Sequence, residues 1–263
     1  MSPFRDGILE GKVAFVAGGT SGINLGIAKR YAQLGAKVAV CGRNPEKAAH
    51  AAAEIGEGAL GLSADVRDYG AIRAAMEEVR GRLGPMDIVV SGAAGNFLAP
   101  VLGMSANAFK TVIDIDLNGT FNVFRGCHDL LNLPGASLIA ITAGQAVNAV
   151  QLQAHACAAK AGINQLVRVL ALEWGPDVRV NGISPGPIEG TEGMARLAPD
   201  SSTKAKHFDR IAMKRWGYIE EIAECAVFLS SDAAKYVTGT ILDCDGGSQI
   251  GDATQRSVDK GLA

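Results

Sequence analysis

The chain has 263 residues, a length that suits one large α/β domain with an extensive core. A net charge of −2 and 5% aromatic residues argue against a nucleic-acid partner. Its five scattered cysteines form no Cys-x-x-Cys pair, which indicates reduced thiols and a cytoplasmic location. The histidines are too dispersed to predict a metal site. The apolar runs are too short to predict a signal peptide or a membrane helix.

Apolar runs and helical patterns alternate along the chain. The predicted strands are Val13–Ala17, Lys37–Cys41, Ala59–Leu62, Asp87–Val90, Ser137–Ile141, Val178–Ile183 and Thr240–Asp243. The predicted helices are Gly22–Leu34, Pro45–Ile55, Asp68–Leu83, Ala106–Leu131, Leu152–Trp174 and Ile219–Ser230. This alternation predicts a doubly wound parallel sheet of the Rossmann type with helices on both faces, in a single domain over residues 1–263. The longest loop, from Ser184 to Arg215, is either a mobile lid or a surface excursion.

A glycine-rich turn joins the first strand to the first helix. Glycines at 18, 19, 22 and 26 allow a ligand to approach the backbone, and the start of the helix offers free N–H groups. The spacing favours a seat for the phosphates of a dinucleotide at Gly18, Thr20, Ser21, Gly22 and Ile23. The alternative is a turn of the same composition that binds no ligand.

The second strand indicates which nucleotide binds. It ends in Cys41-Gly42-Arg43 and has no acidic residue to bond the ribose 2′-hydroxyl of NAD. Arg43 suits a 2′-phosphate, so the sequence favours NADP(H); the alternative is that Arg43 only precedes the next helix. Asp65, after the third strand, is positioned either to accept from the adenine amino group or to cap a helix.

These residues, taken together, resemble the short-chain dehydrogenase/reductase family. The resemblance is carried by the turn Gly18–Gly22, by Asp65-Val66, by Ala93-Ala94-Gly95, by Lys160 and by Pro185-Gly186-Pro187-Ile188. It implies a nicotinamide cofactor and a homotetramer. It also implies that Ser21 and Ile23 contact the phosphates, that Val66 and Ala93 belong to the cofactor site, that Pro185, Gly186 and Ile188 line the nicotinamide, and that Lys160 bonds its ribose.

The chain departs from the family at its usual catalytic residues. The tyrosine, serine, asparagine and third glycine of the family fall on Ala156, Ala143, Asp116 and Asn24, and its Asn-Asn-Ala-Gly motif has become Ser91-Gly92-Ala93-Ala94-Gly95. Alanine cannot protonate a carbonyl oxygen, so ordinary ketone chemistry is in doubt. His155 is interpreted as a packed helix residue rather than a replacement acid.

One branch of the family, the 2,4-dienoyl-CoA reductases of the peroxisomal type and their bacterial relatives, shares these losses. The matching segments are Ala93–Phe97, Asn107–Val112, Asp114–Asp116, His155, Ala171–Gly175 and Pro185–Gly193. This likeness implies that Asn96, Asp116 and Lys160 carry the chemistry. An amide such as Asn96 can stabilise the dienolate oxygen, and a carboxyl such as Asp116 can then deliver the proton to carbon. The tyrosine of the mitochondrial type falls on Gln145.

An acyl-CoA substrate carries phosphates, and the likeness implies that Arg67 and Arg196 contact it. Phe97, Ser105 and Asn107 would line the acyl site. Each has a plain alternative as a surface, core or turn residue, and Asp116 has one as a structural acid bonded to Lys160. Two other functions stay open: reduction of another conjugated or carbonyl substrate, and NADP(H) binding without catalysis.

Overall fold

The computed structural model describes residues 4–191, 194 and 201–254, and its centre is a parallel sheet of seven strands in the order β3-β2-β1-β4-β5-β6-β7. The strands are β1 Val13–Ala17, β2 Lys37–Gly42, β3 Leu60–Ser63, β4 Ile88–Ser91, β5 Ala136–Ile141, β6 Val178–Pro185 and β7 Ile241–Cys244. All neighbouring pairs are parallel. The order reverses between β1 and β4, which creates a crevice at the carboxyl ends of these strands.

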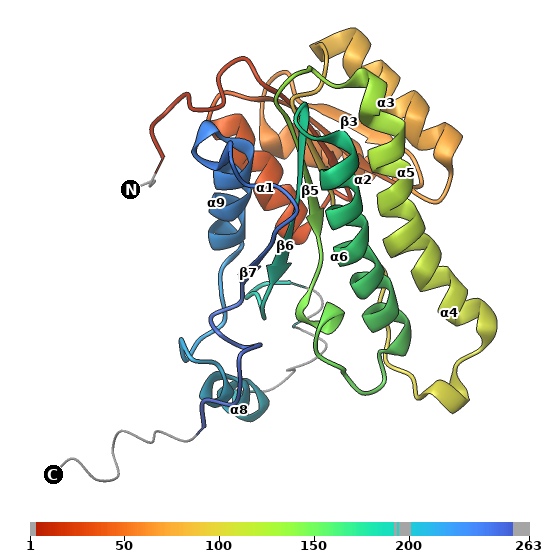
Figure 1. Cartoon of the computed structure of the whole chain (residues 1–263), viewed down its shortest axis with the longest axis vertical. Helices are drawn as coiled ribbons and strands as arrows, with labels where there is room; N and C mark the ends of the chain where they lie inside the picture. Colours follow the sequence, from red (N-terminus) through yellow and green to blue (C-terminus); the bar gives the residue numbers. More distant parts are fainter. Residues whose placement is uncertain (1–3, 192–193, 195–200, 255–263) are drawn as a thin grey trace, which may run out of the picture.

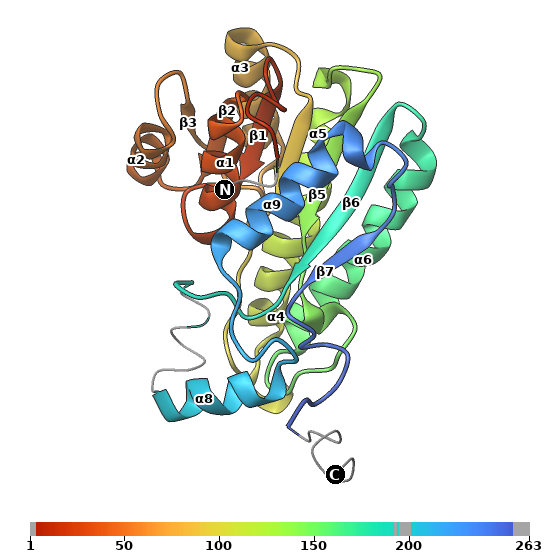
Figure 2. The same cartoon turned by 90° about the vertical axis from the view of Figure 1, so that its left-hand side faces the viewer.

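Helices cover both faces of the sheet (Figures 1 and 2). The α-helices are α1 Gly22–Gln33, α2 Pro45–Ile55, α3 Tyr69–Leu83, α4 Ala106–Ile113, α5 Gly119–Cys127, α6 Ala154–Trp174, α8 Ser201–Arg210 and α9 Ile219–Ser230. One buried apolar cluster joins the sheet to α3, α5 and α6, and a second joins it to α1, α2 and α9. The α/β prediction is therefore confirmed, and nearly all predicted elements are present with ends displaced by one or two residues at most.

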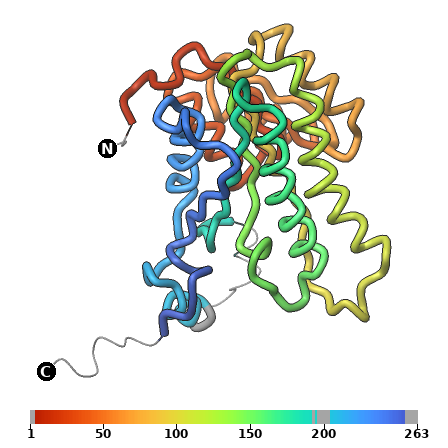
Figure 3. The backbone as a smooth tube through the Cα atoms, in the orientation of Figure 1, coloured from red at the N-terminus to blue at the C-terminus, as the bar shows by residue number. Residues whose placement is uncertain are grey.

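Helices from the two ends of the chain lie side by side on one face, as the red α1 and blue α9 show in Figure 3. The fully buried Tyr31 of α1 places its hydroxyl 2.8 Å from Ser230 Oγ of α9. Burial raises the pKa of Tyr31 above its usual range, so this phenol remains neutral. The contact holds the last turn of α1 against the end of α9, in the C-terminal half of the fold.

The predicted helix Ala106–Leu131 is interrupted. Its middle, Asp114–Asn118, is a π-helical turn, η2, between α4 and α5, and its last residues, His128–Leu130, form a 3-10 turn. A π turn holds one more residue than an α turn, so side chains after it point in a new direction. Asp116 lies within this turn and is 1% exposed, whereas an unbroken helix was expected.

The long segment after β6 contains structure that the sequence did not predict. Helix α8 lies at the end of the molecule where the strands end (Figure 2). Beyond it Ile211 and Trp216, with Met194 before it, form a small buried cluster against which Phe208 packs. The described residues therefore include a second, minor core beside the site, although its behaviour as a lid remains a prediction. No helix among the described residues has the length and apolar character required to cross a membrane.

Candidate active site

A cavity of about 560 Å³ opens at the carboxyl ends of β1, β4, β5 and β6. It lies at the reversal of strand order, where ligands bind in sheets of this kind. The structure brings several predicted site residues together in its wall: Gly22, Ile23, Asn96, Asp116, Lys160, Pro185 and Gly186. Residues separated by up to 164 positions thus meet because parallel strands deliver their loops to one edge.

The turn before α1 fits a bound diphosphate. Gly18 has a φ of +76°, and a Cβ there would come within 2.6 Å of the Ala93 backbone nitrogen, so only glycine is accommodated. Gly22 has a φ of +55° and open space above it. The first turn of α1 has no acidic residue, and the Ser21 side chain does not cap it, so its N–H groups and this hydroxyl are available to an anion.

Asn24 and Gly92, two of the departures from the family pattern, depend on each other. Asn24 Nδ2 donates to the backbone oxygens of Gly92 (2.8 Å) and Gly18 (3.3 Å) and so ties α1 to the loop after β4. A Cβ on Gly92 would come within 2.2 Å of Asn24 Oδ1. The asparagine on the helix therefore requires the glycine after the strand.

Gly92→Ala is expected to destabilise the protein by about 1–3 kcal/mol, because the methyl group displaces a buried, hydrogen-bonded amide. Asn24→Ala removes the clash, so the double variant should lose clearly less stability than the sum of the two single variants. Urea denaturation of all four proteins measures this difference. Strict additivity would contradict the pairing.

Asp116 and Lys160 form a buried ion pair in the cavity wall. Lys160 Nζ lies 3.3 Å from Asp116 Oδ2, with the lysine side chain 10% and the aspartate side chain 1% exposed. Asp116 Oδ1 accepts from the Gly95 backbone nitrogen at 2.7 Å, and Lys160 donates to the Ile141 carbonyl at 3.1 Å. The pair thus connects the π turn and α6 to the loop after β4 and to the end of β5. The carboxylate faces the cavity, so its structural and catalytic interpretations are compatible.

Other parts of the cavity wall consist of a polar side chain, that of Asn96, and of two alanines. Asn96 lines it next to Gly95, with its Nδ2 donating to Gln153 Oε1 at 2.7 Å. Ala143 and Ala156, in place of the family serine and tyrosine, also line it and offer no proton. Asn96 is therefore a side-chain donor in the same cavity wall from which the phenol is missing.

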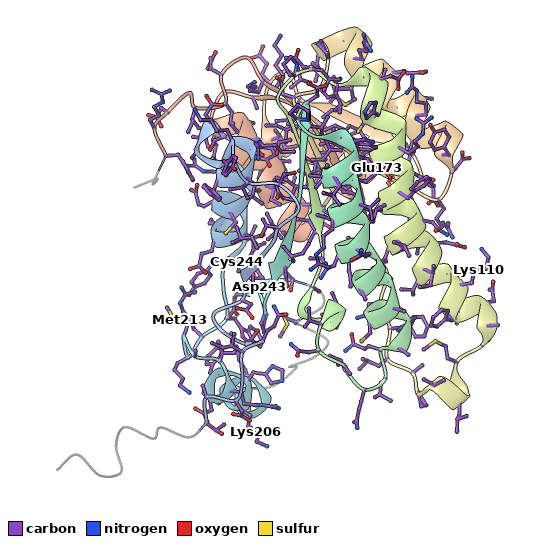
Figure 4. The ribbon with its side chains drawn as sticks, viewed as in Figure 1. Lys110, Glu173, Lys206, Met213, Asp243 and Cys244 are labelled. Atoms are coloured by element: carbon purple, nitrogen blue, oxygen red, sulfur yellow. The ribbon has the colours of Figure 1, made fainter. Side chains whose placement is uncertain are left out.

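The C-terminal segment closes another part of the wall. Gln249 Nε2 donates to Ser184 Oγ (3.0 Å) and to Asp243 Oδ1 (3.1 Å). Asp243 belongs to β7 and is labelled in Figure 4. A Cβ on Gly144 would come within 2.8 Å of the Gln249 side chain, and one on Gly186 within 2.5 Å of the Asp245 backbone. Glycine at these two positions permits the close approach of three segments.

Residues predicted to hold the adenosine end lie outside this cavity. Arg43 is exposed at the end of β2. Arg67 donates from Nε and Nη2 to the Asp65 carboxylate, and these hydrogen bonds hold the pKa of Asp65 below its usual range. Asp65 is thus an ionised acceptor. Arg67 does not line the cavity that was predicted to hold the acyl group, and its contact with an acyl-CoA stays a prediction.

The other described residues predicted to contact the substrate or the nicotinamide do not line the cavity. Phe97 is 38% exposed and packs edge-on against the fully buried His155, with ring centroids 4.2 Å apart. Ser105 accepts from the Ala108 nitrogen, so it caps α4, and Asn107 is exposed in the first turn. Ile188 is 2% exposed and belongs to the buried cluster around α1 and α9, and Arg196 lies outside the described residues.

Two glutamines of the site were not predicted from the sequence: Gln249, which lines the cavity, and Gln153, which contacts Asn96. Gln153 is 4% exposed. Its only sequence signal is its position just before the helix that carries Lys160, and this position does not distinguish it from a helix cap.

The doubly wound sheet and the cavity at its reversal of strand order are typical of the dinucleotide-binding class of α/β proteins. A family model described as enoyl-(acyl carrier protein) reductase matches residues 17–249. The chain belongs to the short-chain dehydrogenase/reductase family.

Relatives with known names agree with this assignment. A peroxisomal 2,4-dienoyl-CoA reductase [(3E)-enoyl-CoA-producing] of Danio rerio is 41% identical over 92% of this chain and 83% of its own. A probable 2,4-dienoyl-CoA reductase [(2E)-enoyl-CoA-producing] of Bacillus subtilis is 37% identical over 92% of this chain and 98% of its own. A solved short-chain dehydrogenase of Bacillus anthracis is 35% identical with a TM-score of 0.81, covering 90% and 96% of the two chains.

Proposed function

We propose that this protein reduces a 2,4-dienoyl-CoA to a 3-enoyl-CoA with NADPH. The observation that carries the proposal is the composition of the cavity wall: Ala156 stands where the family has its acid, while Asn96 and the Asp116–Lys160 pair remain. Such a site can stabilise a developing anion but offers no phenol for a carbonyl oxygen. The names of the relatives support the same substrate class.

Each residue then has a distinct task. The nicotinamide cofactor, held by the turn before α1 and by Lys160, supplies a hydride when bound. Hydride addition at the far end of the diene moves negative charge onto the thioester oxygen, where an Asn96 N–H donates to it. Asp116, which takes up a proton from the Lys160 ammonium 3.3 Å away, delivers it to the α-carbon directly or through a water. The product is the 3-enoyl thioester.

The surroundings support three accompanying proposals. Arg43, which directly follows a β2 strand without an acidic residue, selects NADPH over NADH. Exposed apolar residues on α5 and α6, namely Phe121, Val169 and Leu172, supply a face for a homotetramer. Among the described residues the five cysteines are free, which supports a reducing, cytoplasmic compartment.

The deciding experiment is turnover of 2,4-hexadienoyl-CoA, followed through the loss of reduced nicotinamide absorbance at roughly 340 nm. Turnover with the dienoyl-CoA and none with a panel of simple ketones is expected. In D₂O the product should carry deuterium at the α-carbon, which NMR detects. Deuterium at the γ-carbon would instead identify a 2-enoyl product, and ketone turnover alone would overturn the proposal.

Arg43→Asp is expected to raise the KM for NADPH by about ten- to hundredfold, since a charge-assisted hydrogen bond to a phosphate is lost. The KM for NADH should fall or stay the same, because the new carboxylate can accept from the ribose 2′-hydroxyl. Initial rates with both cofactors give the ratio. Lys235→Asp, at an exposed lysine after α9, is the matched charge control. An unchanged ratio would leave Arg43 as a plain surface residue.

A further inference from the structure

Gln153 occupies the residue before α6, yet its side chain does not serve the helix. It is the N-cap residue, with φ −132° and ψ 33°, and it makes no side-chain capping hydrogen bond. Its side chain is nevertheless buried, and the residue is only 4% exposed. A buried carboxamide must find partners elsewhere, because an unmet polar group costs free energy.

Its partners are two other carboxamides from two different loops. Gln153 Oε1 accepts from Asn96 Nδ2 at 2.7 Å and from Gln145 Nε2 at 3.3 Å. The loops are also joined through their backbones, where Ala99 N donates to the Leu152 carbonyl at 2.9 Å. Asn96 and Gln145 line the cavity, so Gln153 connects two lining residues from outside the lining set.

The two hydrogen bonds fix which way each amide faces. If the Asn96 carboxamide turned over, its oxygen would face the Gln153 oxygen and the two acceptors would repel. If Gln153 turned over, its NH₂ group would face two donors. An Asn96 Nδ2 that gives one N–H to Gln153 keeps its second N–H for another acceptor, because the amide has two.

We propose that Gln153 is a positioning residue that holds the Asn96 carboxamide with one N–H available to the thioester oxygen. This inference rests on the proposed function, in which Asn96 is the oxyanion donor. A misoriented Asn96 would present its own oxygen to a developing negative charge. Gln153 therefore acts on the transition state through Asn96 and has no contact of its own with the reacting atoms.

The test is a double-mutant cycle of Gln153→Met with Asn96→Ala. Gln153→Met keeps the length of the side chain but removes the acceptor, and we expect kcat to fall about tenfold or more with KM for the dienoyl-CoA nearly constant. In the Asn96→Ala background the same change should alter kcat by less than about twofold. Equal effects in both backgrounds would overturn the proposal. Gln165→Met, at an exposed glutamine of α6, is the matched control.

A conservative variant distinguishes positioning from packing. Gln153→Glu retains an acceptor for both donors, so its kcat should lie clearly above that of Gln153→Met. If the two variants are equally impaired, the acceptor is irrelevant and the proposal fails. If the methionine variant folds poorly, the glutamate variant alone tests the proposal. It must then be both folded and active.

A second readout requires no substrate. In protein labelled with ¹⁵N-asparagine, the side-chain amide signal of Asn96, assigned by its loss in Asn96→Asp, should show slow rotation and protection from solvent. In Gln153→Met it should resemble the signal of the exposed Asn107. An unchanged signal would overturn the positioning role even if no dienoyl-CoA were turned over, whereas a changed signal without turnover would place the failure in the proposed function.

Discussion

Asn96→Ala is expected to lower kcat for the dienoyl-CoA by about 10²–10³, the usual effect of removing one donor from an oxyanion site. The charge on the thioester oxygen develops while the hydride is being added and is absent from the bound substrate, so the lost interaction belongs to the transition state. KM for the substrate should therefore change little. Steady-state kinetics separate the two parameters, and NADPH fluorescence shows whether cofactor binding is intact.

Asn96→Asp is the sharper comparison, because aspartate has the size of asparagine but no N–H in its ionised form. It should be at least as impaired as the alanine variant, since a carboxylate repels the developing oxyanion. An aspartate variant with near-normal kcat would show that this position supplies no donor. A higher KM with unchanged kcat would assign Asn96 to ground-state binding only.

The order of strands and helices was predictable because the apolar pattern repeats along the whole chain. Val13–Ala17 is fully buried over five residues, and the helix Pro45–Ile55 starts at a proline after a capping asparagine. Such signals are local, so they can be interpreted one window at a time. Their correct alternation implies the parallel sheet, and the sheet in turn implies where the loops meet.

The π turn at Asp114–Asn118 could not be predicted in the same way. Its apolar spacing is compatible with an ordinary helix, and the driving contacts come from other elements: the Gly95 nitrogen after β4 and Lys160 on α6. Tertiary contacts here decide the local geometry. The candidate Asp116 was identified through a family resemblance, but its orientation required the fold.

The same limit applies to the Asn24–Gly92 and Asn96–Gln153 pairs. In each, one partner lies in or next to a helix and the other in the loop after β4, 68 and 57 positions away in the chain. Asn24 alone is a departure from a glycine pattern, and Gln153 alone is a helix cap. The hydrogen-bonding requirement of a buried amide becomes informative only when its neighbours are known.

Asp116→Ala is expected to destabilise the protein by about 3–5 kcal/mol, since it leaves the Lys160 ammonium buried without its counter-charge. The Gly95 nitrogen also loses its acceptor, and the loop that carries Asn96 loses an anchor. Catalysis should be undetectable. Chemical denaturation gives the stability, but this variant cannot by itself separate structural from catalytic effects.

Asp116→Asn separates them. The amide oxygen can still accept from the Gly95 nitrogen, so the loop should remain in place and the loss of stability should be smaller than for alanine. The amide has no proton to deliver at neutral pH, so kcat should still fall by about 10²-fold or more. A solvent deuterium effect on kcat should increase if slow proton transfer from water replaces the carboxyl. An asparagine variant with near-normal kcat would make Asp116 the structural partner of Lys160 and assign the proton to a water.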